Sequence, residues 1–504
     1  MDRAAFEKRF GHPPGLYILF FTEMWERFSY YGMRGLLKGY MIYYLFVGAR
    51  RALYVPEGAE SSVVPVVAGD PSEVLGLDLV KKFVTFFDAN LDIQGPASQI
   101  YGLYTALVYL TPVIGGYLAD RYFGQRRIVV AGGLLMALGH FVMASERLFF
   151  VALLLLIIGN GAFKPNIQTQ VGALYKDDDP RRDRAYSIFY VGINLGSFIC
   201  NLICGTLAAL KGWHWGFGAA GVGMLFGLVL YLWGQRFLPK EIRASKALAT
   251  NEAVPHRLEE EAARITNGED TSQEVGASKQ VEAPRKGGKL RPEEKRAALS
   301  LVAISALSIP FWAVYEQQGN TMQTWADEQT HWPVILGFQI PSSWFQSFNP
   351  LMIMIFTPVL TMLWDAQRRK NREPTNVSKM AIGSALLGAS FIIMVIGARV
   401  IGNGKGSMLW PFAATLVLTI GELYLSPIGN ALVARVAPVK MVSMLMGVWL
   451  GASFFGNWLS GVIGTLYSKP WVGRERFFLL LTLMGLLTGL AIWAFNKPLK
   501  RSLG

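Results

Sequence analysis

Apolar and polar positions divide the chain into twelve long hydrophobic segments joined by mostly short polar connections. A helix needs about 20 predominantly apolar residues to cross the hydrocarbon core of a bilayer. We therefore predict an all-α polytopic membrane protein whose twelve spans lie near residues 15–47, 97–120, 127–145, 148–174, 184–209, 213–237, 296–322, 342–364, 378–399, 408–435, 441–467 and 475–496. Because the number of spans is even, both termini should lie on the same side of the membrane.

Two longer polar segments interrupt this pattern. Residues 48–96 form a loop after the first span, with a possible amphipathic piece at Val80–Phe87, and residues 238–295 are too polar to cross a membrane. We interpret the second segment as a solvated linker. The predicted organisation is an N-terminal six-helix bundle (1–237), a cytoplasmic linker (238–295) and a C-terminal six-helix bundle (296–504).

Composition and charge agree with this class of protein. Hydrophobic residues make up 52% of the 504 residues and charged residues 16%, whereas soluble domains contain about 25% charged residues. With a cytoplasmic N-terminus, the short cytoplasmic segments carry about 20 Lys and Arg and the short external loops about seven. We therefore expect both termini in the cytoplasm of a cell with an inner membrane. The net charge of +13 then serves orientation and does not indicate nucleic-acid binding.

Metal and redox chemistry find little support. Cys200 and Cys204 lie one helical turn apart without a histidine partner, so we expect packing residues there. The run Asp177 to Asp179 is followed by several arginines and reads as a charge-balanced turn. No nucleophile with a neighbouring base is apparent either. We expect no metal, no cofactor other than the coupling proton, and no enzymatic activity.

A glycine-spaced motif follows the second predicted span. Its residues are Gly116, Asp120, Arg121, Gly124 and Arg126, and a degraded copy with Asp365, Arg368 and Arg369 follows the eighth span. The motif resembles the loop signature of the major facilitator superfamily. That resemblance implies two six-helix halves that rock around a central site near the midplane of the membrane.

The first predicted span carries charges that lipid would reject. At 100° per residue, its polar side chains fall within about 140° of arc. Its five ionisable groups would cost on the order of 10–15 kcal/mol on a lipid-facing helix. The stripe must therefore face the bundle interior or a water-filled space; it comprises Glu23, Glu26, Arg27, Tyr30, Tyr31, Arg34 and Lys38. Later spans add the single charges Lys164, Glu316 and Glu422.

Five of these segments resemble the proton-dependent oligopeptide transporters, a branch of the major facilitator superfamily. The matching stretches are Glu23-x-x-Glu26-Arg27-Phe28-x-Tyr30-Tyr31-Gly32, Phe189-Tyr190-x-Gly192-Ile193-Asn194-x-Gly196, Phe311-Trp312-Ala313-x-x-Glu316-Gln317-Gln318-Gly319, Phe345-Gln346-Ser347-x-Asn349-Pro350 and Gly421-Glu422-Leu423-x-x-Ser426-Pro427-x-Gly429. They span both halves, and the first and last are highly specific. The resemblance implies a proton-coupled symporter of di- and tripeptides. We expect it to function as a monomer in the lipid bilayer.

The resemblance also implies roles for individual residues. Arg34 and Lys164 would face the peptide carboxylate, and Glu422 would face the amino terminus with Asn349 near it. Asn194 would lie beside the peptide backbone. Further peptide-binding residues would be Tyr30, Tyr31, Tyr109, Trp312, Ser426 and Trp449. For proton coupling, Glu23 and Glu26 would exchange partners with Arg27 and Lys164, while Glu316 would pair with Arg34 in an outer gate.

Some observations leave alternatives open. Certain family members carry a histidine on the second helix where this chain has Gly102, so proton sensing by that histidine is not expected. We interpret His140 as a packing residue. A relative that carries nitrate or another anion is a rival interpretation, but it would not retain the glutamates of the first helix. A drug/proton antiporter of the same superfamily would not need both a cationic and an anionic pole.

Overall fold

The structure is a computed structural model that describes residues 3–46, 74–84, 92–176, 179–239, 291–438 and 441–496. Most of the predicted loop 48–96 and nearly all of the predicted linker 238–295 lie outside these residues. The parts that are described form two groups of long helices, and each group has its own buried hydrophobic core.

The N-terminal half contains six long helices. They are α2 (Pro14–Tyr40), α4 (Gln94–Leu118), α5 (Gln125–Val142), α6 (Phe149–Gly172), α7 (Arg181–Cys200) and α9 (Trp213–Gly234). Three short helices accompany them: α1 (Arg3–Phe10), α3 (Leu77–Val84) and α8 (Thr206–Lys211). Helix α3 overlaps the amphipathic piece expected from the sequence, although it begins three residues earlier.

The C-terminal half repeats this arrangement. Its long helices are α12 (Pro292–Tyr315), α14 (Phe348–Arg369), α15 (Asn376–Ile401), α16 (Leu409–Val436), α17 (Val442–Gly464) and α18 (Gly473–Ala494). Among the described residues the two halves therefore supply the twelve long helices that the hydropathy pattern predicts. The short elements are α13 (Thr321–Glu328) and the strands β1 (Thr330–His331), β2 (Val334–Ile335), β3 (Phe338–Gln339) and β4 (Gly406–Ser407).

Nine of the described segments are long and apolar enough to cross a membrane by length and composition alone. Helix α2 is not among them because its charges interrupt the apolar pattern. Its glutamates and Arg27 are nevertheless buried inside the protein, with at most 2% of each residue exposed. The charged stripe thus faces the bundle interior, as the insertion cost of those charges requires.

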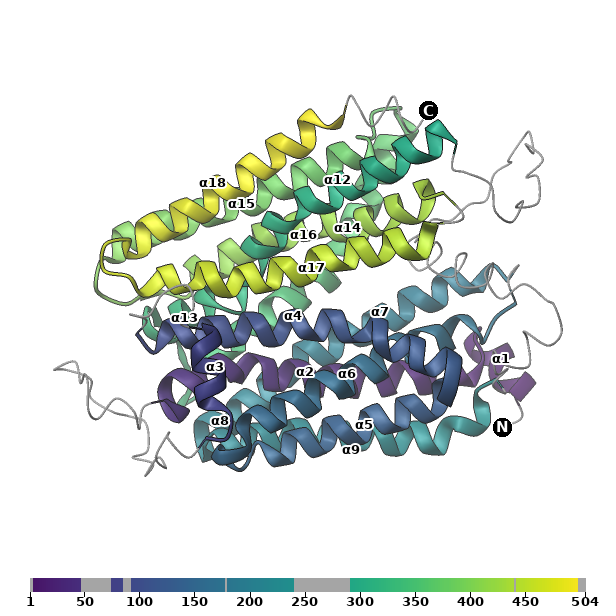
Figure 1. Cartoon of the computed structure of the whole chain (residues 1–504), viewed down its shortest axis with the longest axis horizontal. Coiled ribbons are helices and arrows are strands. Elements are labelled where there is room, and N and C mark those ends of the chain that lie inside the picture. Colours follow the sequence, from purple (N-terminus) through teal and green to yellow (C-terminus); the bar gives the residue numbers. More distant parts are fainter. Residues whose placement is uncertain are drawn as a thin grey trace.

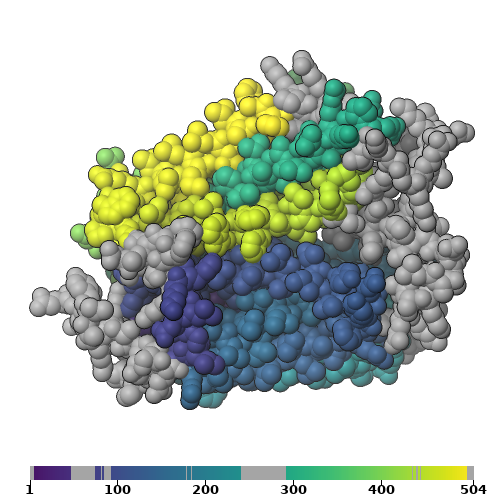
Figure 2. Space-filling model, in the orientation of Figure 1, coloured from purple at the N-terminus to yellow at the C-terminus, as the bar shows by residue number. Residues whose placement is uncertain are grey.

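The two halves lie side by side, and the described ends of the chain lie at the same end of the molecule (Figure 1). We call the opposite end, where α3 and α13 lie, the far end. The surface view shows the same division, with the N-terminal half in purple to blue and the C-terminal half in green to yellow (Figure 2). Helix α4 packs against α17, and α7 packs against α14, so these two pairs join the halves.

Hydrogen bonds between the halves gather at the far end. Trp344 Nε1 donates to the Thr206 hydroxyl at 3.0 Å, and the Ser347 hydroxyl donates to the Phe198 carbonyl at 2.7 Å. The Ser468 hydroxyl donates to Asp92 at 2.9 Å. These residues lie near the far-end termini of their helices, so the structure is closed at the far end.

Several long helices are interrupted near their ends. The π-helical segments η1 (Met41–Leu45), η3 (Ala119–Phe123) and η5 (Asn201–Gly205) continue α2, α4 and α7. The 3₁₀ segments η8 (Glu316–Gln318) and η9 (Ser342–Ser347) follow α12 and precede α14. Apolar periodicity does not distinguish these geometries from an α-helix, so the sequence did not predict the interruptions.

Small residues set the distances between helices within each half. A Cβ on Gly132 would lie 2.7 Å from the Gly159 carbonyl oxygen, and one on Gly223 would lie 2.5 Å from the Phe28 ring. Cys200 and Cys204 are both free and buried, and the Cys204 sulfur lies against Gly32. These residues therefore occupy helix contacts, the role that the sequence indicated.

The backbones of the two halves approach each other closely at Gly102 on α4. A Cβ there would lie 2.6 Å from Cα of Gly461 and 2.8 Å from the Asn457 carbonyl oxygen. Both are backbone atoms and cannot rotate away. The position that carries a histidine in some family members therefore has no room for a side chain in this closed arrangement.

We predict that Gly102→Ala separates α4 from α17 and lowers the free energy of unfolding by about 1–3 kcal/mol, the usual cost of overpacking a tight contact. Thermal unfolding in detergent measures the change. The matched control is Gly447→Ala on α17, because a Cβ at Gly447 meets nothing within 4 Å. Equal melting temperatures for the two variants would contradict the prediction.

Candidate functional site

Arg27 holds two glutamates of α2 in one buried cluster. Its guanidinium forms two hydrogen bonds with Glu26, one of them 2.7 Å from Nη2 to Oε1, and its Nε lies 3.2 Å from a Glu23 oxygen. Asn160 on α6 donates to Glu26 at 3.1 Å. The guanidinium carbon also lies 5.2 Å from the centroid of the Tyr30 ring. One cation thus balances two carboxylates that lipid or a dry interior would otherwise exclude.

Lys164 is not part of that cluster's contacts. Its Nζ lies 5.2 Å from the centroid of the Tyr109 ring, and no carboxylate of the described residues lies within 4 Å of it. Glu23, Glu26 and Arg27 are nevertheless close enough to act on it electrostatically. The structure therefore contains one side of the exchange expected from the sequence, in which Arg27 holds both glutamates and Lys164 has no anionic partner. The exchange itself stays a prediction.

Arg34 reaches across to the other half of the molecule. Its Nη2 forms an ion pair with Glu316, the partner expected from the sequence, and its Nε donates to the Tyr101 hydroxyl at 2.8 Å. The Glu316 side chain is only 1% exposed, and that of Arg34 is 13% exposed. This ion pair thus links α2 to the end of α12.

The C-terminal half supplies an anionic group between α14 and α16. Glu422 accepts a hydrogen bond of 2.9 Å from Asn349, and Tyr315 is a second hydrogen-bond partner. Asn349 also donates to Thr419 at 3.0 Å. Glu422 is half-buried, and its hydrogen-bond partners among the described residues are neutral, so its negative charge is available to a cationic ligand.

The predicted aromatic residues divide into two groups. Tyr31 and Tyr109 are half-buried, whereas Tyr30, Trp312 and Trp449 are packed away, with 4%, 8% and 2% exposed. Of the predicted polar residues, Asn194 donates to the Tyr190 carbonyl of its own helix at 3.0 Å, and Ser426 is half-buried one turn after Glu422. The residues that keep access to solvent are therefore Tyr31, Arg34, Tyr109, Lys164, Glu422 and Ser426.

These groups come close enough to interact electrostatically across the halves. The Tyr31 hydroxyl lies within electrostatic range of the Arg34 charge on its own helix and of the Glu422 charge on the other half. The Glu422 carboxylate in turn lies within electrostatic range of the charges of Glu316 and Arg34. The arrangement places cationic groups from the N-terminal half opposite an anionic group from the C-terminal half, and can hold a small molecule with both charges.

The structure adds residues that sequence reasoning missed. Tyr315 contacts Glu422, Tyr101 contacts Arg34, and Asn160 contacts Glu26. Asn160 precedes Lys164 by one helical turn, so helical spacing could have indicated it. Asn430, whose role the sequence left open, accepts a hydrogen bond of 2.6 Å from the Trp449 indole; that contact joins α16 to α17 and has no sequence signature.

In the glycine-spaced loop motif, the last arginine binds the chain that follows α9. Arg126 donates to the carbonyl of Leu238 at 2.8 Å and to that of Pro239, at the end of α9. Gly124 has a φ of +82°, which suits glycine at the turn into α5. Asp120 is exposed and pairs with no cation of the described residues within 4 Å, so in this structure the contact with a neighbouring helix end is made by Arg126.

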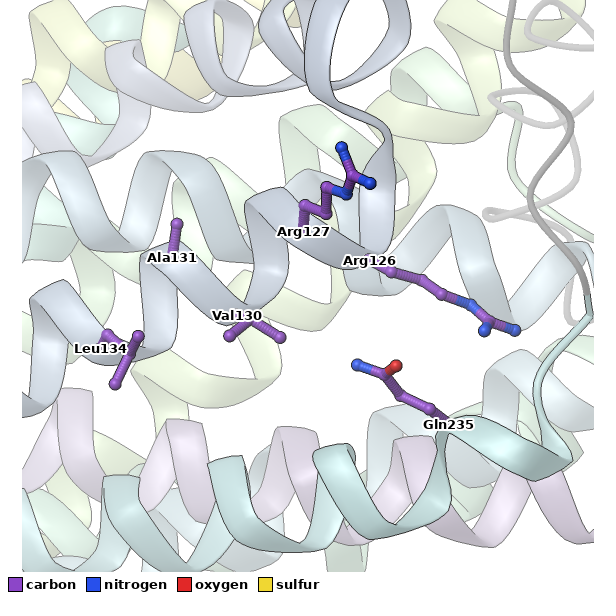
Figure 3. Close-up of a pocket in the computed structure, with 6 residues that line it drawn as sticks. All are labelled: Arg126, Arg127, Val130, Ala131, Leu134 and Gln235. Carbon is purple, nitrogen blue, oxygen red and sulfur yellow. The ribbon is translucent and has the colours of Figure 1, made fainter.

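A cavity of about 300 Å³ lies beside this motif, between α5 and the end of α9 (Figure 3). Its lining residues are Arg126, Arg127, Val130, Ala131, Leu134 and Gln235. None of them belongs to the charged groups between the halves, so we do not assign this cavity to the candidate site.

The described residues contain no group of three or more His, Cys, Asp or Glu side chains that could hold a metal ion. Asp179 pairs with Arg181 at 2.7 Å, and the hydrogen bond from Arg181 lowers the pKa of the Asp179 carboxyl; Asp177 and Asp178 lie outside the described residues. His140 is buried and hydrogen-bonds to Ser29 at 2.6 Å.

Comparisons with known proteins show the family and the fold that this chain shares. A sequence profile of the POT family matches residues 126–477. The peptide transporter YePEPT of Yersinia enterocolitica is 34% identical, covering 90% of this chain and 88% of the relative. A di-/tripeptide transporter of Lactococcus lactis is 31% identical over 98% and 97% of the two chains. A crystal structure of a mutant of the peptide transporter POT in complex with alafosfalin superposes with a TM-score of 0.74, at 29% identity and with 98% and 96% coverage.

We predict that Asn430→Ala lowers the free energy of unfolding by about 1–3 kcal/mol, because it leaves the buried Trp449 indole without an acceptor. Thermal unfolding in detergent tests this. Trp449→Phe removes the donor as well, so adding it to Asn430→Ala should cost less than it does in the parent protein. Additive losses would show that the hydrogen bond does not couple the two residues.

Proposed function

Because the chain belongs to the POT family and has the two-bundle fold of its major facilitator relatives, we propose that it is a proton-coupled symporter that imports di- and tripeptides across the cytoplasmic membrane by alternating access. Its relatives include a peptide transporter and a di-/tripeptide transporter, which supports peptide as the substrate. The family supports proton coupling, and we propose no other coupling ion or cofactor. A peptide substrate must then be recognised at its two charged ends, whatever its side chains.

The proposal rests on the placement, on opposite halves of the molecule, of cationic and anionic groups that are unpaired among the described residues. Lys164 has no anionic partner within 4 Å among the described residues, and Glu422 has only neutral hydrogen-bond partners. In our proposal the peptide carboxylate binds Lys164 and Arg34, and the peptide ammonium group binds Glu422 beside Asn349. A nitrate-like anion has no positive charge for Glu422 to bind, and a cationic drug has no negative charge for Lys164 to bind.

The surroundings of these groups suit side chains of varied size. Tyr31, Tyr109 and Ser426 are half-buried and keep contact with solvent, so we propose that they contact the peptide directly. Asn194 would contact its backbone after giving up the hydrogen bond within its own helix. Tyr30, Trp312 and Trp449 are buried and would shape the wall from behind, which refines the direct contacts that the family resemblance implied.

Proton coupling would use the two ion-pair systems of α2. Protonation of Glu23 or Glu26 weakens the hold of Arg27 on that carboxylate and frees the remaining negative charge for Lys164. Protonation of Glu316 removes the charge that Arg34 binds and loosens the contact between the halves. Both events are local changes in charge that bias a two-state movement of rigid halves.

The cycle follows from the closed far end. We propose that both termini are cytoplasmic, so the far end, which is closed in this structure, faces outward. Loosening of the far-end contacts would admit peptide from outside, and their re-formation would precede release inside. Each chain contains both halves and both charged poles, so we propose that a monomer suffices.

The proposal is tested by transport in proteoliposomes. We expect labelled di- and tripeptides to exchange by counterflow without a proton gradient and to accumulate only when a gradient is present. Lys164→Ala should lose accumulation because the coupling exchange lacks its lysine. Nitrate and free amino acids serve as competitors. Failure of any labelled peptide to exchange in the parent protein would overturn the proposed function.

Recognition of the amino terminus gives a separate prediction. Glu422→Gln should raise the KM for unmodified dipeptides by roughly 10- to 100-fold, since a charge-assisted hydrogen bond contributes about 1.5–3 kcal/mol. Competition by an N-acetylated dipeptide should change little. The matched control is Glu475→Gln, which removes a half-exposed glutamate that pairs only loosely, at 3.7 Å, with Arg399. A uniform loss for both ligands would contradict the assigned role of Glu422.

A further inference from the structure

Lys38 is a buried cation that the proposed cycle does not use. It lies on the far-end half of α2 and is 2% exposed. Its Nζ donates to the side-chain oxygen of Asn320 at 2.5 Å and to the backbone carbonyl of the same residue at 3.1 Å. No carboxylate of the described residues lies within 4 Å of it, although Asp92, Asp327 and Glu328 act on it at longer range.

The contact between Lys38 and Asn320 lies next to the Arg34–Glu316 ion pair, four residues further along both segments. Arg34 and Lys38 are four residues apart on α2, and Glu316 and Asn320 are four residues apart on the facing segment. On α2 this spacing places both side chains on the same face, one turn apart, and on the facing segment the Asn320 N–H donates to the Glu316 carbonyl at 3.2 Å. Two cations of one helix therefore bind two successive acceptors of the other half.

Asn320 occupies a break in the seventh long helix. It lies between η8 and α13, with φ −97° and ψ −88°, outside the helical region. Its side-chain nitrogen donates to the Ser460 carbonyl on α17 at 3.2 Å, as does that of Gln317 at 2.9 Å. By binding Asn320, Lys38 thus connects α2 to the junction of α12, α13 and α17.

We propose that Lys38 is a positioning residue for the transport cycle, a latch that holds the far end closed whether or not the neighbouring glutamate is protonated. The proposal rests on the proposed function. A proton can neutralise Glu316 and release Arg34, but the amide of Asn320 cannot be neutralised in this way. The Lys38 contact therefore persists when the ion pair is broken, and it sets how readily the far end opens.

The latch is reversible because its acceptors are neutral. Burial removes the hydration of the ammonium group, and two neutral acceptors and distant carboxylates compensate for only part of that loss. When the halves part at the far end, water can solvate Lys38 again. The contact therefore favours closure without preventing opening, whereas an ion pair of the same burial would be harder to break.

A buried reporter thiol measures the opening. Ser98 on α4 is fully buried, and its Cβ lies 3.1 Å from the position of a Cβ built on Gly464, where the Asn320 amide also lies. In a protein with Ser98→Cys, Cys200→Ser and Cys204→Ser, reaction with a bulky maleimide in detergent reports separation of the halves there. No peptide or proton gradient is present in this assay.

We expect Lys38→Met to accelerate labelling roughly tenfold, as befits loss of hydrogen bonds from a charged donor, and Lys38→Gln, which keeps a donor, to have a smaller effect. Lys405→Met removes an exposed lysine outside this contact and should leave the rate unchanged. Adding Asn320→Ala to Lys38→Met should change the rate less than it does in the parent, because the two residues share one contact.

Transport distinguishes a latch from general loosening. A more open far end should lower the KM for external peptide and also lower the maximal rate, because the far-end-closed state is less populated. Labelling of Lys38→Met at the parent rate, or equal acceleration by Lys405→Met, would overturn the latch. If Lys38→Met does not purify as a single species, Lys38→Gln decides by the same criteria. Absence of counterflow in the parent would overturn the proposed function and leave the labelling result valid.

Discussion

A charge inside a bilayer must find a partner, and this constraint positions helix α2. Its Arg27 balances Glu23 and Glu26 within the N-terminal half, whereas Arg34 and Lys38 find their acceptors in the C-terminal half. One face of one helix therefore serves both as the centre of a bundle and as part of the contact between bundles. Any movement of the halves at the far end must break or replace the second set of partners.

The two halves can move as bodies because each has its own core. Buried apolar residues form separate clusters in the N-terminal and C-terminal helices, and glycines bring the helices of each half close together. The contact between halves is different in character, since it includes polar side chains at the far end and the glycine approach at Gly102 and Gly461. Polar contacts exchange with water at small cost, so this boundary can open while the cores stay intact.

Much of the candidate site could be predicted because its charged residues lie in apolar helices, where a charge is costly unless it has a function or a partner. Few structural roles explain a charge in an apolar segment. Such charges are the stripe on α2, Lys164, Glu316 and Glu422. Partners were harder to predict. The ion pair between Arg34 and Glu316 came from resemblance, while the contacts of Tyr315 with Glu422, Asn430 with Trp449 and Lys38 with Asn320 join helices whose relative rotation no local pattern encodes.

The sequence by itself determined the membrane class, the number and places of the long helices, and the charges that cannot face lipid. These properties depend on the composition of one segment and on the solvent around it. Only the tertiary structure decided that Arg27 holds both glutamates while Lys164 has no anionic neighbour in the described residues. It also decided that Arg126 contacts the chain just after α9, and that polar side chains join the halves at the far end. Such pairings depend on how helices from distant parts of the chain are rotated and offset, and hydrophobic periodicity constrains only which face is buried.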